Sequence, residues 1–351
     1  MNFASDNTSG ICPEIMAALT AANEGAAMPY GNDDWTHCLE AALSDLFETA
    51  VTVFPVATGS AANALALSVL SPPFGAIYCH ETAHIEADEC GAPEFFTGGA
   101  KLVKLAGSQG KIRAADLARV LDSAPIGVVH SVQPAAVSIT QATEAGTVYS
   151  LEEIAAIAQV AHAHSLPLHM DGARFANAMV RLGCSPAEAT WKVGVDVLSF
   201  GATKNGAMAA EAVIFFGGDR VGSFAYRRKR GGHLFSKMRF LSVQLLAYVT
   251  EDLWLRNAAH ANAMATKLAE GFATLPMTTL CYPVEANELF VQMPSDLVQA
   301  LKAQGFEFYE WDEVGDRPGY VITRLVTAFN TAPHDVEAFL AAIQQFSSVS
   351  V

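Results

Sequence analysis

Charged residues are scarce in this chain, and basic residues are scarcer than acidic ones. Only 16% of the 351 residues are charged, and 21 Lys and Arg stand against 36 Asp and Glu, which gives a formal net charge of −15. Nucleic-acid binding needs a basic surface, so no nucleic-acid partner is expected. Hydrophobic residues make up 51% of the chain, which is typical of a large globular enzyme and not of a disordered protein.

Long apolar runs are also missing. No stretch approaches the ~20 apolar residues that a membrane-spanning helix needs. The first residues, Met-Asn-Phe-Ala-Ser-Asp, have neither the positive segment nor the apolar segment of a secretion signal. We therefore expect a soluble, cytoplasmic protein that has no membrane partner.

Paired cysteines and nucleotide-binding fingerprints are absent as well. The six cysteines are scattered without a Cys-x-x-Cys pair, which predicts a reducing compartment rather than a disulfide framework. No cluster of nitrogen and sulfur ligands suggests a metal site. There is no G-x-G-x-x-G and no G-x-x-x-x-G-K-[ST], so a nucleotide-binding enzyme is disfavoured.

One basic run interrupts the acidic chain, at Arg227-Arg228-Lys229-Arg230. It has two interpretations, a solvated helix face or a contact with a phosphate or a neighbouring subunit. The sequence does not choose between them.

Short apolar runs rich in β-branched residues alternate with helical patterns as far as Gly232, which is typical of an α/β fold with a mostly parallel sheet. Helices are expected at Ala61–Leu70 and after two capping boxes, Ser150-Leu-Glu-Glu153 and Ser185-Pro-Ala-Glu188. Strands are expected at Val51–Val56, Ala76–Cys79, Lys101–Leu105, Ile126–Val129, Ala136–Thr140, Leu166–Met170, Val195–Phe200 and Ala212–Phe216.

The pattern changes after Gly232. The segment His233–Leu275 has few helix breakers and predicts one or two long helices that link two domains. From Met277 onward, strands and helices alternate in a compact α+β unit. We expect a large domain at residues 1–245, whose N-terminal segment reaches the functional site, and a smaller domain at residues 246–351.

Three short motifs suggest chemistry, and the first is Thr58-Gly59-Ser60. Glycine lets the backbone approach a ligand closely, and the free amides at the start of the following helix form an anion site. A structural turn of small residues has the same appearance, so the motif alone does not establish a phosphate site.

The second motif is Asp171 with Arg174, at the end of a predicted strand. In open parallel sheets, ligands bind at this edge. The pair could be a structural ion pair only. Its functional interpretation is that a carboxylate keeps a pyridine nitrogen protonated, so that the ring can accept electrons from a substrate.

The third motif is Lys204, in Ser199-Phe-Gly-Ala-Thr-Lys-Asn-Gly206. It follows an apolar strand and lacks the charged neighbours of a surface loop. A lysine in such a closed apolar site can form an imine. Phosphate loop, strand-end aspartate and lysine occur in this order, and together they predict that Lys204 holds pyridoxal 5′-phosphate (PLP) as a Schiff base.

These residues resemble the threonine aldolase branch of the β-eliminating lyase family, which are fold-type I PLP enzymes. The most specific matches are His169-Met-Asp-Gly-Ala-Arg174 and Phe200-Gly-Ala-Thr-Lys-Asn-Gly206, and the similarity extends from Ala4-Ser-Asp-Asn7 to Arg324-Leu-Val-Thr327. Asp88-Glu-Cys-Gly-Ala-Pro-Glu-Phe-Phe96 and Ser236-Lys-Met-Arg-Phe-Leu241 are similar to bacterial low-specificity threonine aldolases and phenylserine aldolases. The resemblance implies an α/β large domain with a mostly parallel seven-stranded sheet and a smaller C-terminal α+β domain.

The resemblance also implies roles for individual residues. Lys204 would hold PLP, Asp171 would pair with the pyridine nitrogen, and His84 would stack on the ring. Arg174 would orient Asp171 and contact the cofactor or the substrate. The phosphate contacts would be Gly59, Ser60 and, in addition, Lys237 or Arg239.

Substrate contacts follow from the same resemblance. Ser5 and Arg324 would bind the substrate carboxylate, which suits the bidentate fork of arginine. Tyr30 would reach the active site of a neighbouring subunit. The family implies homodimers or homotetramers whose active sites lie at the subunit interface.

One departure from the family leaves the proton acceptor open. Many members carry a histidine after the strand that reads Val137-Ser-Ile-Thr-Gln141, where we align Thr143. His130 lies before that strand and is not assigned the role. His84, or a water that it holds, is the candidate acceptor of the β-hydroxyl proton. Asp88 could polarise His84, contact the substrate side chain or be a solvated carboxylate.

The reaction that this resemblance implies is retro-aldol cleavage of L-β-hydroxy-α-amino acids to glycine and an aldehyde. Threonine, allo-threonine and phenylserine all fit this chemistry. The alternatives are another fold-type I PLP reaction, such as β-elimination, decarboxylation or transamination, and an inactive regulatory relative. The fold does not decide among these reactions.

Overall fold

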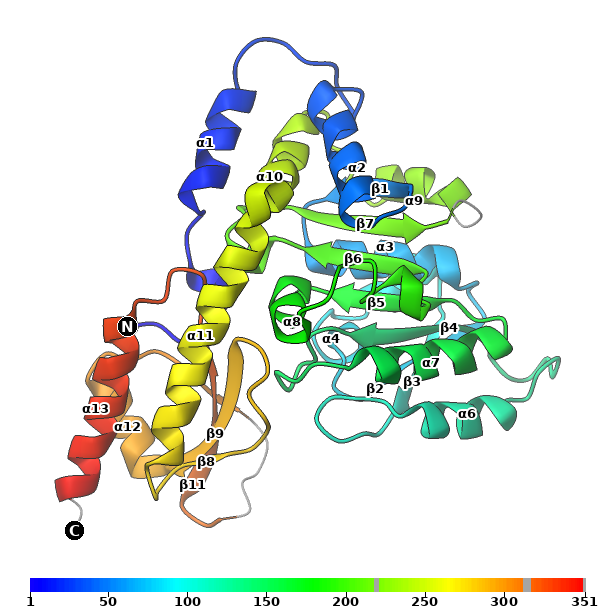
Figure 1. Cartoon of the computed structure of the whole chain (residues 1–351). Helices are drawn as coiled ribbons and strands as arrows, with labels where there is room; N and C mark the ends of the chain where they lie inside the picture. The colour runs from blue at the N-terminus through cyan, green and yellow to red at the C-terminus, as the bar shows by residue number, and fades with distance from the viewer. Residues whose placement is uncertain (218–220, 312–316, 350–351) are drawn as a thin grey trace.

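A seven-stranded sheet forms the centre of the larger part of the molecule (Figure 1). The computed structural model describes residues 1–217, 221–311 and 317–349. The strand order is β1-β7-β6-β5-β4-β2-β3, and β7 alone runs antiparallel to its neighbours. The mostly parallel seven-stranded sheet is therefore confirmed. The strands are β1 Val51–Val56, β2 Gly75–His80, β3 Lys101–Leu105, β4 Gln133–Thr140, β5 Leu168–Gly172, β6 Val197–Gly201 and β7 Glu211–Phe216.

Helices cover both faces of this sheet. Figure 1 shows α6, α7 and α8 on one face and α3 on the other. The helices of this part are α1 Pro13–Ala22, α2 Asp34–Leu46, α3 Gly59–Leu70, α4 His84–Ala87, α5 Ala92–Thr97, α6 Ala114–Asp122, α7 Leu151–Ala163, α8 Phe175–Leu182 and α9 Phe224–Arg230.

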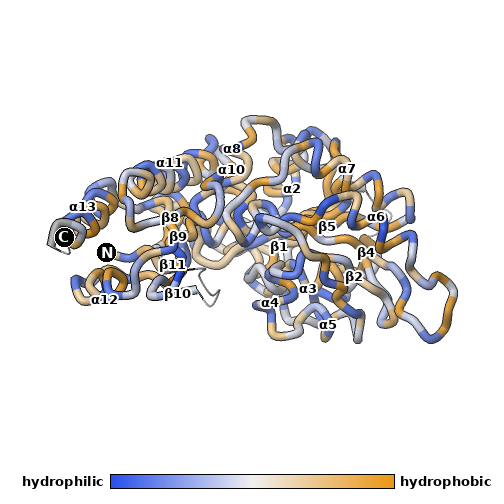
Figure 2. Tube along the Cα trace, turned by 90° about the horizontal axis from the view of Figure 1, so that it is seen from below, coloured by the Kyte–Doolittle hydropathy of each residue, from blue (hydrophilic) through white to orange (hydrophobic). Residues whose placement is uncertain are grey.

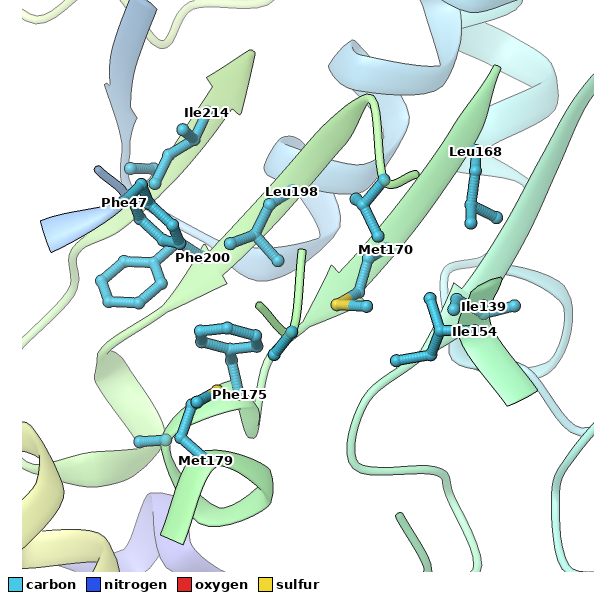
Figure 3. Packing of buried hydrophobic residues seen from close by; sticks show 14 of the residues in the cluster. Phe47, Ile139, Ile154, Leu168, Met170, Phe175, Met179, Leu198, Phe200 and Ile214 are labelled. Atoms are coloured by element: carbon cyan, nitrogen blue, oxygen red, sulfur yellow. The ribbon is translucent and has the colours of Figure 1, made fainter. Parts of the chain in front are cut away.

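Alternation along the strands explains this sandwich. Successive side chains of a strand point to opposite faces. In β6, Leu198 and Phe200 enter the core with α7 and α8, whereas Val197 packs in the core with α3. Figure 3 shows Phe200 beside Phe47 and Phe175, and the Phe47 and Phe200 ring centroids lie 6.3 Å apart. Because both faces are buried, these strands read as continuous apolar runs.

The predicted strand Ile126–Val129 is wrong. Ile126 is 67% exposed and Val129 is 92% exposed, and the segment forms turns between α6 and β4. Gly127 has a φ of +76°, and its amide donates to the side chain of Gln133. A run of apolar residues resembles a buried strand in the sequence, and only the packing shows that this one lies on the surface.

Both predicted capping boxes form, but only one begins an α-helix. Ser150 and Glu153 exchange bonds at the start of α7. Ser185 and Glu188 exchange the same two bonds, yet the residues that follow form a turn and a short 3₁₀ helix at Trp191–Val193. A capping box satisfies the first amides of a turn whether or not a helix continues from it.

Two long helices link the sheet to a smaller C-terminal unit, as predicted for His233–Leu275. They are α10 Arg239–Val249 and α11 Leu253–Ala273, with a kink at Glu251 and Asp252, whose φ angles are positive. In Figure 1 they form one long diagonal from the sheet to the C-terminal unit. No helix within the described ranges is long and apolar enough to cross a lipid bilayer.

The smaller unit is an antiparallel sheet of order β10-β11-β9-β8 with two helices, so the predicted C-terminal α+β domain is confirmed. Figure 2 shows it at one end of an elongated molecule, and its buried apolar residues form a core of their own. Its elements are β8 Thr279–Leu280, β9 Glu288–Pro294, α12 Ser295–Ala303, β10 Tyr309–Trp311, β11 Tyr320–Val326 and α13 Pro333–Val349.

The N-terminal segment crosses from the smaller unit to the site. Phe3 is buried in the core of the smaller unit, where its amide donates to Glu307 and its carbonyl accepts from Val326. The two main cores meet along α11, because Ala258 belongs to the first and Ala265 to the second. The domain boundary at 245/246 stays a prediction. The change from the first core to the second lies within α11, the helix after the predicted boundary.

Candidate active site

Three chain segments meet at the C-terminal edge of the large sheet. The loop after β1, the end of β5 and the turn after β6 enclose a cavity of about 400 Å³, which we call the inner cavity. This is the sheet edge at which parallel α/β folds bind ligands. Its lining residues are Asn7, Ala57, Thr58, Gly59, Ser60, Asn63, His84, Glu89, Glu144, Asp171, Ala173, Thr203, Lys204, Ala209 and Glu211.

Lys204 lies in the 3₁₀ turn Thr203–Asn205, directly after β6. The next residue anchors this turn, because Asn205 donates to the Tyr248 hydroxyl at 2.9 Å and to the Trp254 carbonyl at 2.8 Å. Gly201 is required before it, since a Cβ there would lie 2.6 Å from the Ala173 carbonyl oxygen. The backbone of Lys204 is therefore held between α10, α11 and the Asp171 loop. Its side chain lines the inner cavity.

The first turn of α3 faces the same cavity with free backbone amides. Thr58 caps the helix by accepting from the Ala61 amide at 3.2 Å. The amides of Gly59 and Ser60 lie in the first turn, so they have no intrahelical acceptor. A Cβ built on Gly59 meets nothing within 4 Å, so the space beside it is open. This arrangement can bind a phosphate.

Asp171, the penultimate residue of β5, is 3% exposed. One of its carboxylate oxygens accepts from the Asn63 side chain at 2.7 Å and the other accepts from the Ala173 amide at 3.0 Å. The prediction that Arg174 orients Asp171 is wrong. The described partners of Arg174 are Asp6 and Glu288, and Asn63 orients Asp171 instead.

His84 begins α4 and lines the inner cavity. Its Nδ1 lies 2.9 Å from Glu89, which is buried and also accepts from Asn63. The hydrogen bond to Glu89 raises the pKa of His84 despite partial burial, and burial raises the pKa of Glu89. Glu89, not Asp88, therefore polarises the imidazole, and Asp88 is exposed.

Replacing Glu89 with glutamine should lower the pKa of His84, because the neutral amide no longer stabilises the imidazolium. The measurement is an NMR titration of the ring protons, assigned with a His84→Asn variant. Glu86→Gln is the matched control, because that carboxylate pairs with Lys104 at 3.0 Å instead. An unchanged His84 titration in Glu89→Gln would contradict the hydrogen bond.

Glu211, the first residue of β7, also lines the inner cavity. It is 7% exposed and accepts from the Ala202 amide at 2.9 Å. Burial raises the pKa of this carboxyl to about 7, against the opposing hydrogen bonds from Thr203 and Ala202 and the charge of Lys204. A carboxyl of this kind can hold a proton beside Lys204 near neutral pH.

A second, wider cavity of about 720 Å³ adjoins the first, and we call it the outer cavity. Asn7, His84, Glu144 and Lys204 line both cavities. The other residues that line the outer cavity are Ser5, Ala87, Asp88, Arg174, Tyr309, Glu310, Trp311 and Arg324.

Arg174 is locked in place between two carboxylates. Its Nε and Nη2 donate to the two oxygens of Asp6 at 2.8 and 3.2 Å, and its Nη1 lies 3.2 Å from Glu288. Burial opposes its charge, but Asp6 and Glu288 outweigh that penalty and raise its pKa. In turn, burial of Asp6 is outweighed by Arg174 and Lys204, so the pKa of Asp6 is lowered.

Arg324, in contrast, keeps donors available. Its one hydrogen bond to a described residue runs from Nε to Glu288. An arginine has five N–H donors, so the two terminal nitrogens of Arg324 can bind a carboxylate in the outer cavity. Ser5 lies at the same cavity, where its hydroxyl accepts from the Asn7 amide at 3.1 Å. These two predicted substrate contacts are thus brought together.

The loop after β4 presents Glu144 to the site, not Thr143. Thr143 is fully buried, and its hydroxyl bonds the Gln109 carbonyl at 3.2 Å and the Thr147 hydroxyl at 2.8 Å. These contacts close a tight turn around Gly146. Glu144 extends from that turn into both cavities.

Tyr30 and Arg239 line neither cavity. Tyr30 is 46% exposed, with the Lys229 ammonium 5.1 Å from its ring centroid, and Arg239 donates to the Gly25 carbonyl at 3.2 Å. The basic run lies on α9 and is not simply solvated. Arg228 is buried against Phe54, and burial lowers its pKa to about 10.

Most of the carboxylates and amides that shape the site were not predicted from the sequence. They are polar residues that are buried or lie at the edge of the sheet, and none belongs to a recognisable motif. Buried polar residues inside apolar runs, such as Glu211 before Ala-Val-Ile-Phe-Phe, are the one signal that could have found them. The missed residues are Asp6, Asn63, Glu89, Glu144, Glu211 and Glu288.

Comparison with known proteins agrees with this geometry. The chain is 48% identical over 307 residues to proteins described as low specificity L-threonine aldolase from Pseudomonas aeruginosa and from a Pseudomonas sp., covering 88% of this chain and 88% of each relative. A solved structure of Leishmania major threonine aldolase superposes with a TM-score of 0.92 at 27% identity, covering 98% of this chain and 99% of that one.

The family model described as beta-eliminating lyase matches residues 2–295. The cofactor of this family is PLP, and the inner cavity fits it, with an amine at Lys204, free amides at Gly59 and Ser60, and a carboxylate at Asp171. The chain therefore belongs to the β-eliminating lyase family, a family of PLP enzymes.

Proposed function

We propose that this chain is a PLP-dependent carbon–carbon lyase that cleaves L-threonine and related L-β-hydroxy-α-amino acids to glycine and an aldehyde. The supporting observation is that the side chain of Lys204 lines both the inner cavity and the outer cavity. The outer cavity also contains Arg324, which can bind a carboxylate. A small amino acid can thereby place its amine at the cofactor and its carboxylate at Arg324. The relatives at 48% identity support the same activity.

The residues of the inner cavity have separate tasks. Lys204 would attach the cofactor, and the amides of Gly59 and Ser60 would hold its phosphate. Asp171, held by Asn63, would keep the ring nitrogen protonated, and His84 would lie against the ring. When bound, PLP would supply the acceptor for the electron pair released as the Cα–Cβ bond breaks.

In the outer cavity, Arg324 and Ser5 bind the substrate carboxylate. Arg174 is a positioning residue in this scheme, because the described contacts already use its Nε, Nη1 and Nη2. It joins Asp6 of the N-terminal segment to Glu288 of β9, and Glu288 in turn holds Arg324. This chain of ion pairs aligns the two units of the molecule around the substrate.

A substrate panel tests the proposal. Purified protein supplemented with PLP is incubated with L-threonine, L-allo-threonine and L-phenylserine, and glycine and aldehyde are measured. Equal amounts of glycine and aldehyde are expected. Release of a 2-oxo acid and ammonia instead would favour β-elimination, and transfer of the amine to an added 2-oxo acid would favour an aminotransferase.

An aromatic-walled recess favours phenylserine among these substrates. A third cavity of about 300 Å³ shares Ala87, Asp88, Glu144 and Trp311 with the outer cavity. Its wall holds Tyr282, Phe290 and Trp311, with successive ring centroids 5.5 and 5.4 Å apart. Such rings pack well against an aryl side chain.

A homodimer or homotetramer completes the site in this proposal. Tyr30, which is exposed and lines neither cavity of its own chain, would enter the neighbouring subunit's site. Arg239 or Lys237 would reach the phosphate from the same region. The six cysteines are free thiols, which suits a reducing, cytoplasmic compartment.

A further inference from the structure

Glu144 lies where three cavities meet. It lines the inner cavity, the outer cavity and the third cavity of about 300 Å³ with its aromatic wall, which we call the aromatic recess. Among the described residues it is the only one common to these three cavities. Lys204 and His84 line two of the three, the inner cavity and the outer cavity. A side chain in this position faces the point where a substrate held at Lys204 and Arg324 directs its Cβ substituents.

The carboxylate of Glu144 is uncommitted. It forms no hydrogen bond or ion pair with any residue in the described ranges, whereas Glu89, Glu211 and Glu288 are all bonded. Burial raises its pKa, with Glu288 acting in the same direction and Lys204, Arg174 and His84 opposing. Glu144 is half-buried, and a carboxylate that faces a cavity with no partner among the described residues is available to a ligand.

The backbone beneath Glu144 is rigid. The Thr143 amide donates to the Thr147 carbonyl, and the Gly146 amide donates to the Thr143 carbonyl, each at 2.9 Å. The Thr143 and Thr147 hydroxyls are also bonded to each other. Gly146 has a φ of +74°, and a Cβ there would lie 2.5 Å from the Glu288 carbonyl oxygen. A group that moves a proton needs such a fixed position.

We infer that Glu144 is the residue that accepts the β-hydroxyl proton during cleavage, a role that rests on the proposed aldolase function. The proton passes from the β-hydroxyl oxygen to the Glu144 carboxylate, and the C–O bond becomes the aldehyde double bond as Cα–Cβ breaks. The cofactor, when bound, would supply the acceptor for the Cα–Cβ electron pair. A proton from water completes the Cα–H bond of glycine, and the proton held by Glu144 passes to water, so no net proton is gained or lost.

His84 is the rival acceptor, and its bonding distinguishes it from Glu144. Its Nδ1 is bonded to Glu89 at 2.9 Å, so only Nε2 of the ring is available to a substrate. Glu144 has no such partner among the described residues and follows Thr143, the residue that we aligned with a histidine of many family members.

Two reactions of the same holoenzyme test the assignment. Cleavage of L-threonine needs a β-hydroxyl base, whereas exchange of the glycine Cα proton with deuterated water does not, because glycine has no β-hydroxyl. In Glu144→Gln, cleavage should fall by about 10²- to 10⁴-fold, the usual contribution of a general base. Glycine exchange, followed by proton NMR, and the Kd for PLP, from absorbance titration of the apoprotein, should stay within about twofold of wild type.

Controls separate this role from a structural one. Glu152→Gln changes an exposed glutamate in the first turn of α7 and should leave all three readouts unchanged. Glu144→Asp should retain part of the cleavage rate, and the acidic limb of the wild-type pH–kcat profile should be absent in Glu144→Gln.

Three results would overturn the assignment. Cleavage within about fivefold of wild type, or an equal loss of cleavage and glycine exchange, would remove Glu144 from the step. Loss of cleavage in His84→Gln with full cleavage in Glu144→Gln would assign it to His84. If wild-type protein exchanges glycine but releases no aldehyde from any substrate of the panel, the proposed function itself fails and the role of Glu144 falls with it.

Discussion

Replacing Lys204 with alanine should abolish turnover of L-threonine and remove the visible absorbance that bound PLP gives the protein. Lys204 is the only lysine among the described residues that line the inner and outer cavities. Without its amine, the cofactor has no covalent attachment in this cavity. We expect kcat to fall by at least about 10³-fold, because the reaction can no longer proceed through the covalent bond between the lysine and the cofactor.

The matched control is Lys192→Ala, which removes an exposed lysine paired with Glu48. That variant should keep wild-type kcat and absorbance. Both variants should unfold at the same temperature as the wild-type apoprotein, measured by circular dichroism. A Lys204→Ala protein with full activity would refute the PLP assignment.

Replacing Asp171 with asparagine should lower kcat by about 10²- to 10³-fold, a size typical for the loss of one preorganised electrostatic contact. The neutral amide no longer favours a protonated ring nitrogen, so electron withdrawal weakens. The fold should survive, since the Oδ1 of Asn63 has no partner among the described residues and can accept from the new amide. We expect a stability cost of about 1 kcal/mol.

The measurement compares kcat, the Kd for PLP and the urea midpoint of Asp171→Asn with those of Asp122→Asn. Asp122 is 73% exposed in its side chain and pairs with His164, so that control should match wild type. If Asp171→Asn kept its kcat, another group would have to protonate the ring, and the assignment of this carboxylate would be incorrect.

Much of the fold could be predicted from local patterns in the sequence. The apolar strands of the large sheet are buried on both faces, so they appear as continuous β-branched runs, and the Ser150 capping box marks α7. Ile126–Val129 failed because composition does not report solvent exposure, and these residues lie in a surface turn.

Part of the site could be predicted in the same way. Gly59 and Lys204 follow strands and Asp171 lies at the end of one, and the ends of parallel strands share one edge of a sheet. The predicted strands therefore indicate that these three residues lie close together. Glu144 was not predicted, because a loop has no periodicity that shows which of its side chains enters a cavity, and the alignment placed only Thr143 opposite the histidine of the family.

The sequence by itself determined that Gly59, Ser60, Asp171 and Lys204 line one cavity, since each lies at a fixed offset from a strand or helix end. Only the tertiary structure decided their partners. Asp6 meets Arg174 across 168 positions of the chain, and Glu288 joins Arg174 to Arg324. Such contacts depend on how the two units pack, and no local pattern encodes them. The same packing places Glu144 where the three cavities meet, with no hydrogen bond or ion pair to any residue in the described part of the chain.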